Sequence, residues 1–436
     1  MEPASKTLSL AVLVNALQSG ELPLLSYLDQ LEAHFEEIEP TLQAFVPENG
    51  RFDRLRQEAA ALQARFPKPE NRPPLFGIAI GVKDIFHVNG FTTRAGSALP
   101  PELFQGQEAN TVTTLRRAGA LILGKTVTTE FAYFGPGPTR NPYKPDHTPG
   151  GSSSGSAAAV GAAMCHLTLG TQTIGSINRP AAYCGVVGFK PSYDRITRDG
   201  VLPLSNSLDH VGFFTPSVIG ADNVANLLCR YWQLVHTVKK PVLGIPEGPY
   251  LEQATSEGLA HFQDICDRLQ AAGFIIKRVP TMPDFAAIRQ RHMMIVDAEL
   301  AQVHANWFAD HADLYKPETA EHIRRGQQAK AEAVGAALNG RFRLRQQFNS
   351  IMDKHKLDLW ITPAAPGPAP QGLDNTGDPV MNLPWSYSGL PTLTLPSGFA
   401  ANGLPLGLQL VGRWYADEAM LSWAADIEPV LQATLY

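Results

Sequence analysis

Apolar residues recur at helical spacing in the first part of the chain and gather into short continuous runs after it. Leucines repeat at helical spacing from residue 8 to residue 40, which predicts two amphipathic helices, and helical patterning continues to about residue 65. The proline-rich stretch 66–74 then marks a connector. The pattern therefore predicts helices first and a sheet that starts after residue 74.

The first continuous apolar run, LFGIAIGVKDI at 75–85, predicts a buried strand that meets a charge only at Lys83. Residues 111–123 predict a helix that passes into a second buried strand, and small residues predict a helix at 156–164. Further apolar runs predict strands within 166–176, immediately before Lys190 and at 357–363. This alternation predicts an α/β fold with a large mixed, mostly parallel central sheet covered by helices on both faces.

No internal repeat and no clean shift in composition divides the chain, so we expect a single domain over residues 1–436. The segment 250–355 is mainly helical in pattern and interrupts the strands. The expected parts are N-terminal helices (1–65), a core (75–220), the helical excursion (250–355) and the C-terminal part of the core (357–436).

The charge balance argues against nucleic acid or an anionic membrane as the main partner. The chain has 36 Lys and Arg against 41 Asp and Glu, a formal net charge of −5, with no long run of one sign. Its four cysteines show neither CxxC spacing nor the density of a disulfide scaffold, which is typical of a reducing cytosol. No stretch is apolar for the roughly 20 residues of a membrane span, and the N-terminal apolar patch fits a helix better than a secretory signal. We expect a cytoplasmic protein.

Two short motif matches are weakened by their context. GALILGKT at 119–126 fits the phosphate-binding loop, but its variable positions are apolar and predict a core strand that ends at Gly124. GSSSG at 151–155 fits the nucleophile elbow, but a turn precedes it instead of a strand, and no later histidine has an evident acid partner. There is no HExxH, no Cys/His cluster at metal spacing and no DxDxDG loop, so we expect no metal and no cofactor.

A second glycine–serine turn offers a candidate nucleophile. Ser176 follows Gly175 between a predicted strand and an apolar segment, where a hydroxyl can attack a carbonyl carbon beside backbone N–H groups. Lys83, at the end of a buried strand, loses hydration; this lowers its pKa and supplies a neutral amine as base. Most strand-end lysines are simply solvated and most serines in glycine turns simply form the turn, so the residues alone leave both interpretations open.

A set of segments, taken in order, resembles the signature blocks of the amidase signature family. The resemblance covers most of the chain, and 250–355 is its least distinctive part. The segments are FGIAIGVKDIF, TPGGSSSGSAAAVGAAM, GTQTIGSINRPAAYCGVVGFKPS, SLDHVGFFTPSV and PWSYSGLPTLTLPSGFAANGLPLGLQLVG.

The resemblance implies a Ser-cisSer-Lys triad that hydrolyses amides through an acyl-enzyme. By motif, Lys83 is the lysine, Ser176 the nucleophile and Ser152 the bridging serine with a cis peptide. The backbone N–H groups expected to bind the oxyanion are those of Thr173, Ile174, Gly175 and Ser176. Ser153 and Ser154 are expected to hydrogen-bond backbone and cap the helix that begins near Gly155.

The chain departs from the commonest family pattern around the nucleophile. Gln172 stands at an Asp position, Ile174 at a Gly position, and the arginine comes three residues after the serine instead of two. This arrangement is similar to the malonamidase branch, which implies that Arg179 holds a substrate carboxylate; a structural ion pair is the alternative. We also expect Ser153 and Gln172 to contact substrate.

The expected function is an amidohydrolase that cleaves a small amide, with or without a carboxylate, and releases ammonia or an amine. Two alternatives stay open: the glutamine-hydrolysing subunit of a tRNA-dependent amidotransferase, and a hydrolase of biuret- or urea-like amides. A nucleotide-binding protein built on GALILGKT is the remaining class. The partner expected is a small amide, with a homodimer allowed, and neither nucleic acid nor membrane.

Overall fold

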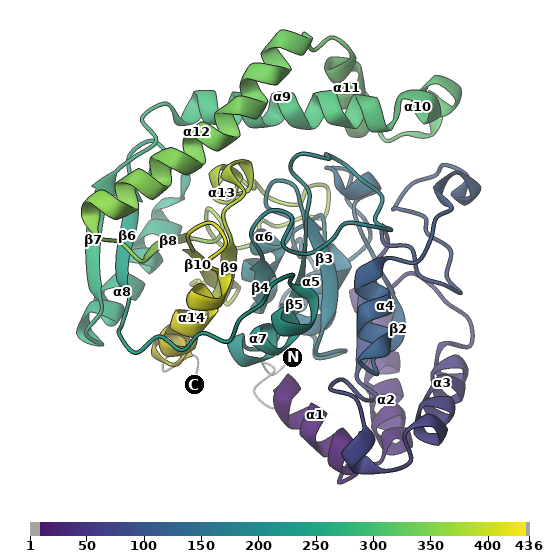
Figure 1. The fold of residues 1–436 in the computed structure, drawn as a ribbon. Coiled ribbons are helices and arrows are strands. Elements are labelled where there is room, and N and C mark those ends of the chain that lie inside the picture. The colour runs from purple at the N-terminus through teal and green to yellow at the C-terminus, as the bar shows by residue number, and fades with distance from the viewer. Residues whose placement is uncertain (1–8, 433–436) are drawn as a thin grey trace.

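A ten-stranded sheet runs through the molecule (Figure 1). The computed structural model describes residues 9–432. The strands are β1 (Ala79–Lys83), β2 (Leu121–Thr126), β3 (Thr168–Gln172), β4 (Val187–Lys190), β5 (His210–Thr215), β6 (Val242–Glu247), β7 (Ile275–Pro280), β8 (Leu359–Pro363), β9 (Thr392–Phe399) and β10 (Pro405–Val411).

Helices surround this sheet. They are α1 (Leu10–Ser19), α2 (Leu24–Leu42), α3 (Arg51–Arg65), α4 (Asn110–Arg117), α5 (Ser154–Gly161), α6 (Asn178–Cys184), α7 (Val218–Leu228), α8 (Ser256–Ala271), α9 (Phe285–Val303), α10 (Ala305–His311), α11 (Pro317–Gln327), α12 (Ala331–His355), α13 (Leu383–Ser388) and α14 (Asp417–Gln432). None of the helices within residues 9–432 is long and apolar enough to cross a bilayer.

The sheet is mixed, and its parallel strands lie at its two ends. The strand order is β2-β1-β3-β5-β4-β9-β10-β8-β6-β7. β1 pairs in parallel with β2 and β3 at one end, and β6 pairs in parallel with β8 and β7 at the other. Every pairing between β3 and β8 is antiparallel. The expected large mixed sheet is confirmed, but parallel pairs do not dominate it, because short returns such as the β9–β10 hairpin join central strands.

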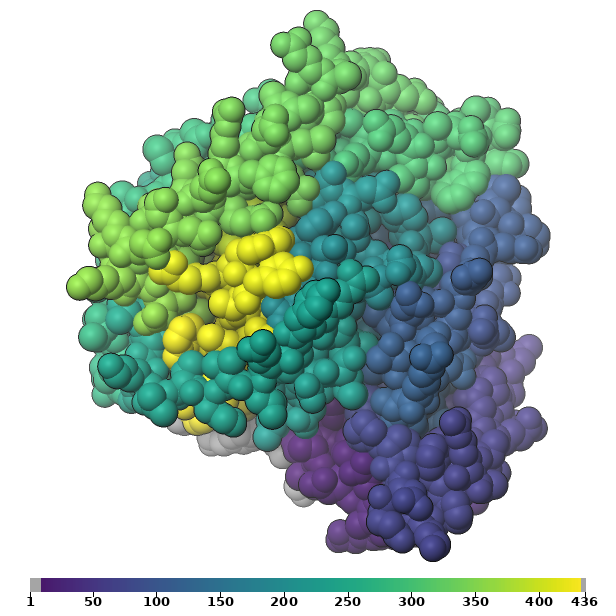
Figure 2. Space-filling view, in the orientation of Figure 1, coloured from purple at the N-terminus to yellow at the C-terminus, as the bar shows by residue number. Residues whose placement is uncertain are grey.

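Helices pack on both faces of the sheet. α5 and α6 pack against each other and together contact strands β1, β3, β4 and β9, whereas α7 and α14 pack together on β4, β5, β9 and β10 and lie in front of the sheet in Figure 1. Helices α9 to α12 form what we call the helical cap, across the top of Figure 1. In the space-filling view of Figure 2 the cap rests directly on the core below it. Strands from residue 79 to residue 411 share the one sheet.

The small residues of α5 allow this helix to approach the sheet closely. A Cβ atom at Gly155 would lie 2.1 Å from the carbonyl oxygen of Ala44 and 2.5 Å from the amide nitrogen of Val127. A larger residue would therefore push α5 away from the end of β2. The segment just before this helix is tied to the same part of the chain, because the carbonyl of Ser152 accepts the N–H of Thr129 at 3.2 Å.

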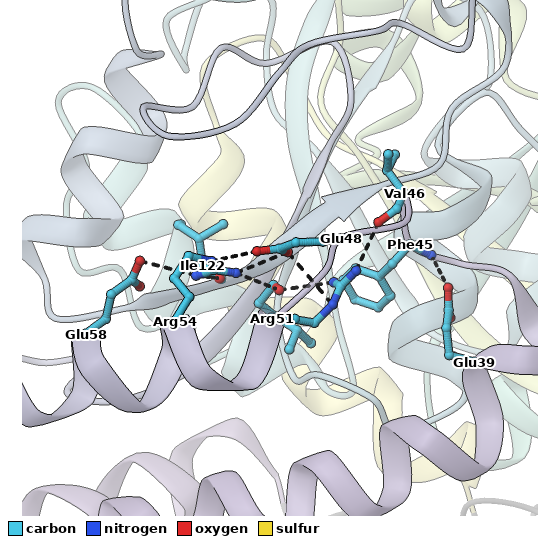
Figure 3. Close-up of polar contacts among 9 residues, drawn as sticks. Glu39, Phe45, Val46, Glu48, Arg51, Arg54, Glu58 and Ile122 are labelled. Atoms are coloured by element: carbon cyan, nitrogen blue, oxygen red, sulfur yellow. Dashed lines mark hydrogen bonds and ion pairs between the residues drawn. The ribbon is translucent and has the colours of Figure 1, made fainter.

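The N-terminal helices cover the edge of the sheet (Figure 3). β2 is the outermost strand at this end, and an uncovered edge would leave backbone groups without partners. Arg51 of α3 donates to the carbonyl of Leu123 (3.1 Å), and Arg54 donates to that of Ile122 (2.9 Å). Glu48 accepts from Arg54 at 2.6 Å. These contacts hold β2, and through it β1, in position.

Two features of the fold differ from the sequence expectations. The segment expected to be mainly helical after residue 250 also contains β7, an edge strand whose Ile275 is 59% exposed. Because β7 lacks a continuous apolar run, its pattern did not predict a strand; β6 before it was not predicted either. The strand expected to end at Gly124 continues to Thr126, so the last six residues of GALILGKT form a strand and not a phosphate-binding loop.

The lysine of that motif, Lys125, forms a buried ion pair. Its Nζ lies 2.7 Å from Oδ1 of Asp84, and both side chains are almost fully buried. Burial lowers the pKa of Lys125 and raises that of Asp84, while each charge opposes the shift of the other. Asp84 directly follows Lys83, so this pair fixes the end of β1.

We predict that Lys125→Met lowers the free energy of unfolding by about 3–5 kcal/mol, because it leaves the buried Asp84 carboxyl without its partner. Urea denaturation followed by circular dichroism measures this loss. Asp353→Ala is the control, since Asp353 is 70% exposed and its pair with Arg413 should be worth less than about 1 kcal/mol. Equal small losses in both variants would contradict the prediction.

Candidate active site

Lys83 stands at the end of β1 with its amine inside the protein. The side chain has no exposed surface. Its Nζ lies 2.8 Å from Ser152 Oγ and 2.8 Å from Thr171 Oγ1, the latter on the neighbouring strand β3. Burial holds the pKa of Lys83 well below its usual value, and the Asp209 carboxylate partly opposes this shift. A neutral amine has a lone pair that can accept a proton from a hydroxyl.

Ser152 is placed by a sharp turn before α5. The Gly151–Ser152 peptide is cis, and Gly150 has φ +82°, a conformation that favours glycine. A Cβ atom at Gly151 would lie 2.7 Å from Cγ2 of Thr376. The glycines therefore let the turn fit against the 376–377 loop while the Ser152 hydroxyl faces Lys83.

Ser176 lies in the turn between β3 and α6. It is 8% exposed and lines a small pocket. The other lining residues are mostly apolar: Ala132, Tyr133, Phe134, Thr173, Ile174, Gly175, Arg179, Leu204 and Pro379. Among residues 9–432 no hydrogen bond joins the Ser176 hydroxyl to Ser152; the structure links Lys83 to Ser152 and puts Ser176 at the pocket. Catalytic hydrogen bonds are often long without substrate and tighten when it binds.

The turn before Ser176 presents free backbone donors. Within the described part of the chain, the N–H groups of Thr173, Ile174, Gly175 and Ser176 donate no hydrogen bond to protein, although all four residues line the pocket. Buried N–H groups are nearly always paired, so a run of free ones beside a serine hydroxyl is a site for an oxygen of a ligand.

Gln172 does not reach this pocket. It is fully buried, its Oε1 accepts the N–H groups of Ile177 (2.8 Å) and Asn178 (2.9 Å), and its Nε2 donates to Asn178 Oδ1 and Ser386 Oγ. Both ends of the amide are therefore used in holding the turn. The structure thus shows Gln172 bonded to protein, and its contact with substrate stays a prediction.

Ser153 and Ser154 bond to neighbouring strands. Ser153 Oγ donates to the carbonyl of Thr171 (3.1 Å) and accepts its N–H (3.2 Å), and Ser154 Oγ donates to the carbonyl of Val127. Both hydroxyls bond backbone as expected, but Ser153, at the N-cap position of α5, makes no side-chain cap. Ser153 is also fully buried and is not among the residues that line the pocket of Ser176, and its contact with substrate stays a prediction.

Arg179 lines the pocket but is largely occupied by protein oxygens. Its Nη2 donates to the carbonyl of Gly151 (2.7 Å) and to Thr376 Oγ1 (3.0 Å), and its Nη1 donates to the carbonyl of Gly377 (2.5 Å). Its Nε has no partner in the described residues. Burial lowers the pKa of Arg179 to about 10, and no carboxylate of residues 9–432 forms an ion pair with it. The alternative of a structural ion pair is thus not seen among these residues; Arg179 clamps the turn of Ser152 with neutral acceptors.

Some site residues were not singled out from the sequence. Thr171 accepts from Lys83, and buried Asp209 accepts from Thr173 Oγ1 at 2.6 Å. Both stand in segments that carry the family resemblance, which was the available signal. Tyr133 lies on the pocket wall. Its hydroxyl oxygen is 2.6 Å from His322 Nδ1 and donates to Asp297 Oδ1 at 3.3 Å. The last two residues belong to the helical cap, so only the fold brings them to the site.

Within residues 9–432, no group of three or more His, Cys, Asp and Glu side chains could hold a metal ion. The chemistry that the arrangement offers is that of hydroxyls, a neutral amine and backbone N–H groups. Such groups suit nucleophilic attack on a carbonyl carbon.

Comparison with known proteins identifies the family. A family model described as Amidase matches residues 25–421. A glutamyl-tRNA(Gln) amidotransferase subunit from a Synechococcus strain is 30% identical, over 94% of this chain and 95% of that protein. A crystal structure of an amidase superposes with a TM-score of 0.89 at 31% identity, covering 97% of this chain and 100% of that one. The peptide amidase of Stenotrophomonas maltophilia superposes with a TM-score of 0.83 at 25% identity, covering 99% and 98%.

Three findings point to the same family. They are the segments that resemble amidase signature blocks, the mixed sheet with its surrounding helices, and the match to the family model over most of the chain. This chain therefore belongs to the amidase signature family, whose enzymes hydrolyse linear amide C–N bonds.

Proposed function

We propose that this chain hydrolyses small amides by nucleophilic attack of Ser176, with Lys83 as the base and Ser152 as the bridge between them. The observation that carries the proposal is the contact of 2.8 Å between the buried, neutral Lys83 amine and the Ser152 hydroxyl. Burial lowers the pKa of the amine and so favours the neutral form that a general base requires.

Each proposed step conserves atoms and protons. Ser176 Oγ bonds to the substrate carbonyl carbon while its proton passes to Ser152 Oγ, and the Ser152 proton passes to Lys83 Nζ. The C–N bond then breaks, and the leaving nitrogen takes the proton back along the same route. Water repeats the attack on the acyl-enzyme and releases the carboxylic acid. Thr171 accepts one N–H of Lys83, and the neutral amine keeps its lone pair for the Ser152 proton.

The free N–H groups of Thr173, Ile174, Gly175 and Ser176 support an oxyanion site beside the nucleophile. Negative charge on the carbonyl oxygen develops only during attack, so donors fixed in advance lower the barrier. Losing one such donor typically costs on the order of 3 kcal/mol in transition-state stabilisation.

For the substrate we propose a small amide that carries a carboxylate, as in the malonamidase branch. The pocket wall is mostly apolar, and Arg179 adds a positive charge that no carboxylate of residues 9–432 pairs. Because three of its five N–H groups already donate to protein, the Nε–H and one Nη1–H are left for an anion. The expected interaction is thus charge attraction plus contact with one or both of these remaining N–H groups.

The relatives favour one further candidate function. Several proteins about 30% identical over nearly the whole chain are glutamyl-tRNA(Gln) amidotransferase subunits, so release of ammonia from glutamine is the alternative. Hydrolysis assays on the purified chain alone separate the two. The main proposal expects turnover of malonamate or another short amide without partner proteins. If glutamine is the one substrate hydrolysed, and partner proteins must be added for its hydrolysis, the alternative is favoured.

We predict that Ser176→Ala abolishes turnover and leaves the melting temperature nearly unchanged, because a small turn residue is exchanged for another. A fluorophosphonate should label Ser176 in the parent protein, as read by mass spectrometry of its peptides. Ser153→Ala is the matched control and should remain labelled. Labelling at Ser153 in the parent protein would contradict the assignment.

The base should be visible in the pH profile. We predict that Lys83→Ala lowers kcat by several orders of magnitude, and that the activity of the parent protein falls as acid protonates Lys83. Asp209→Asn removes the carboxylate that raises the pKa of Lys83, so the acid limb of kcat/KM should move to lower pH. An unmoved limb, or a move to higher pH, would show that another group titrates.

Arg179 should separate acidic from neutral substrates. We predict that Arg179→Ala lowers kcat/KM for malonamate roughly ten- to a hundred-fold more than for a neutral amide of similar size, the range expected for one charge-assisted contact. A further loss common to both substrates would report the clamp on Gly151. Equal losses on the two substrates, with a lowered melting temperature, would mean that Arg179 only holds the turn of Ser152 and does not bind a substrate carboxylate.

A further inference from the structure

The carbonyl groups around the nucleophile turn are held from the side of the core. The carbonyl of Ile174 accepts from Ser386 Oγ at 2.6 Å, and that of Gly175 accepts from the N–H of Arg179 at 3.0 Å. The carbonyl of Gln172 accepts from Nδ1 of His210 at 3.2 Å; this nitrogen carries its proton because its other partner is also a carbonyl. Each anchor belongs to protein that is nearly or fully buried.

Anchoring a carbonyl also aims the next N–H group. In a trans peptide the C=O and N–H bonds point in opposite directions. Among the described residues the only cis peptide is Gly151–Ser152, so this rule applies throughout the nucleophile turn. With the carbonyls of Gln172, Ile174 and Gly175 held toward the core, the N–H groups of Thr173, Gly175 and Ser176 point away from it, and these residues line the pocket.

Ser386 differs from the other anchors because its proton has a choice of directions. A serine hydroxyl rotates freely and donates only one hydrogen bond. Gln172 Nε2 donates to Ser386 Oγ at 2.9 Å, which occupies one lone pair and leaves the serine proton for the Ile174 carbonyl. The Gln172 side chain thus sets the direction of the Ser386 hydroxyl. The hydrogen bond from Ser386 to the Ile174 carbonyl joins α13 to a turn 212 residues earlier in the chain.

We propose that Ser386 is a positioning residue for the oxyanion site: its hydroxyl, oriented by Gln172, holds the Ile174 carbonyl so that the Gly175 N–H points into the pocket. Ser386 itself is fully buried and does not line the pocket. Its effect therefore acts on the transition state, in which the oxyanion forms, and much less on ground-state binding. The inference rests on the proposed function of the Ser176 site.

The test compares two serines of one short helix. Ser386→Ala removes the donor to Ile174, and Ser388→Ala, the matched control, removes a buried hydroxyl that donates to the carbonyl of Trp385 in its own helix. For Ser386→Ala we expect kcat to fall roughly ten- to a hundred-fold with KM within about two-fold, somewhat less than loss of a whole donor. Ser388→Ala should change kcat less than about two-fold. Ser386→Cys keeps the volume but donates weakly, and serves if the alanine variant does not fold.

Binding of trifluoroacetone separates positioning from general damage. This ketone forms a tetrahedral adduct with a nucleophilic serine and carries the oxyanion, so Ser386→Ala should raise its inhibition constant by the same factor by which kcat/KM falls. An unchanged inhibition constant, a loss confined to KM, or equal effects of Ser386→Ala and Ser388→Ala would overturn the proposal. Turnover surviving in Ser176→Ala would instead overturn the proposed function, independently of Ser386.

Gln172 provides the second arm of the experiment. In Gln172→Glu the carboxylate competes with the Ile174 carbonyl for the Ser386 proton, and kcat should fall about ten-fold. If Gln172 acts through Ser386, the double variant Gln172→Glu/Ser386→Ala is no slower than the slower single variant. Additive losses would overturn this orientation of Ser386 by Gln172.

Discussion

The desolvated amine of Lys83 is the constraint on which the site depends. An ammonium ion without water or a contacting carboxylate is costly in the protein interior, so the folded state favours the neutral form. Hydroxyls are the groups that suit a neutral amine, and Ser152 and Thr171 both contact Nζ at 2.8 Å. Asp209 lies close enough to oppose the shift in the pKa of Lys83 without pairing with it. The same burial that makes the lysine a base thus dictates uncharged partners around it.

The rest of the fold excludes water from the Lys83 amine and holds its partners in position. β1 is enclosed between β2 and β3, and α3 covers the outer edge of β2 with Arg51 and Arg54 (Figure 3). Asp84, which directly follows Lys83, forms a buried ion pair with the nearby Lys125. On the other side of the site, the helical cap reaches the pocket wall through Tyr133. Distant parts of the chain therefore converge on a few atoms.

The sequence predicted those parts of the fold that have continuous apolar runs. β1 and β8 were evident because every residue in them is buried, whereas the edge strand β7 exposes Ile275 and could not be recognised by its pattern. Lys83 and Ser176 were candidates from their own sequence context, Ser152 followed from the resemblance to a family, and the structure brings Lys83 and Ser152 into contact. The partners of Gln172 and Arg179 could not be predicted, because Ser386 and Gly377 come from loops and helices about 200 residues away.

The proposed role of Lys83 as the base requires that its amine is uncharged at the pH at which the protein works. Protein labelled with ¹³C at the lysine Cε position allows this carbon to be followed by NMR as pH changes, with the Lys83 signal identified by its absence from Lys83→Arg. We predict a Lys83 signal already at its neutral position at neutral pH, which moves only on acidification. A Lys83 signal that titrates together with the surface lysines, near their usual pKa of about 10.4, would contradict the account.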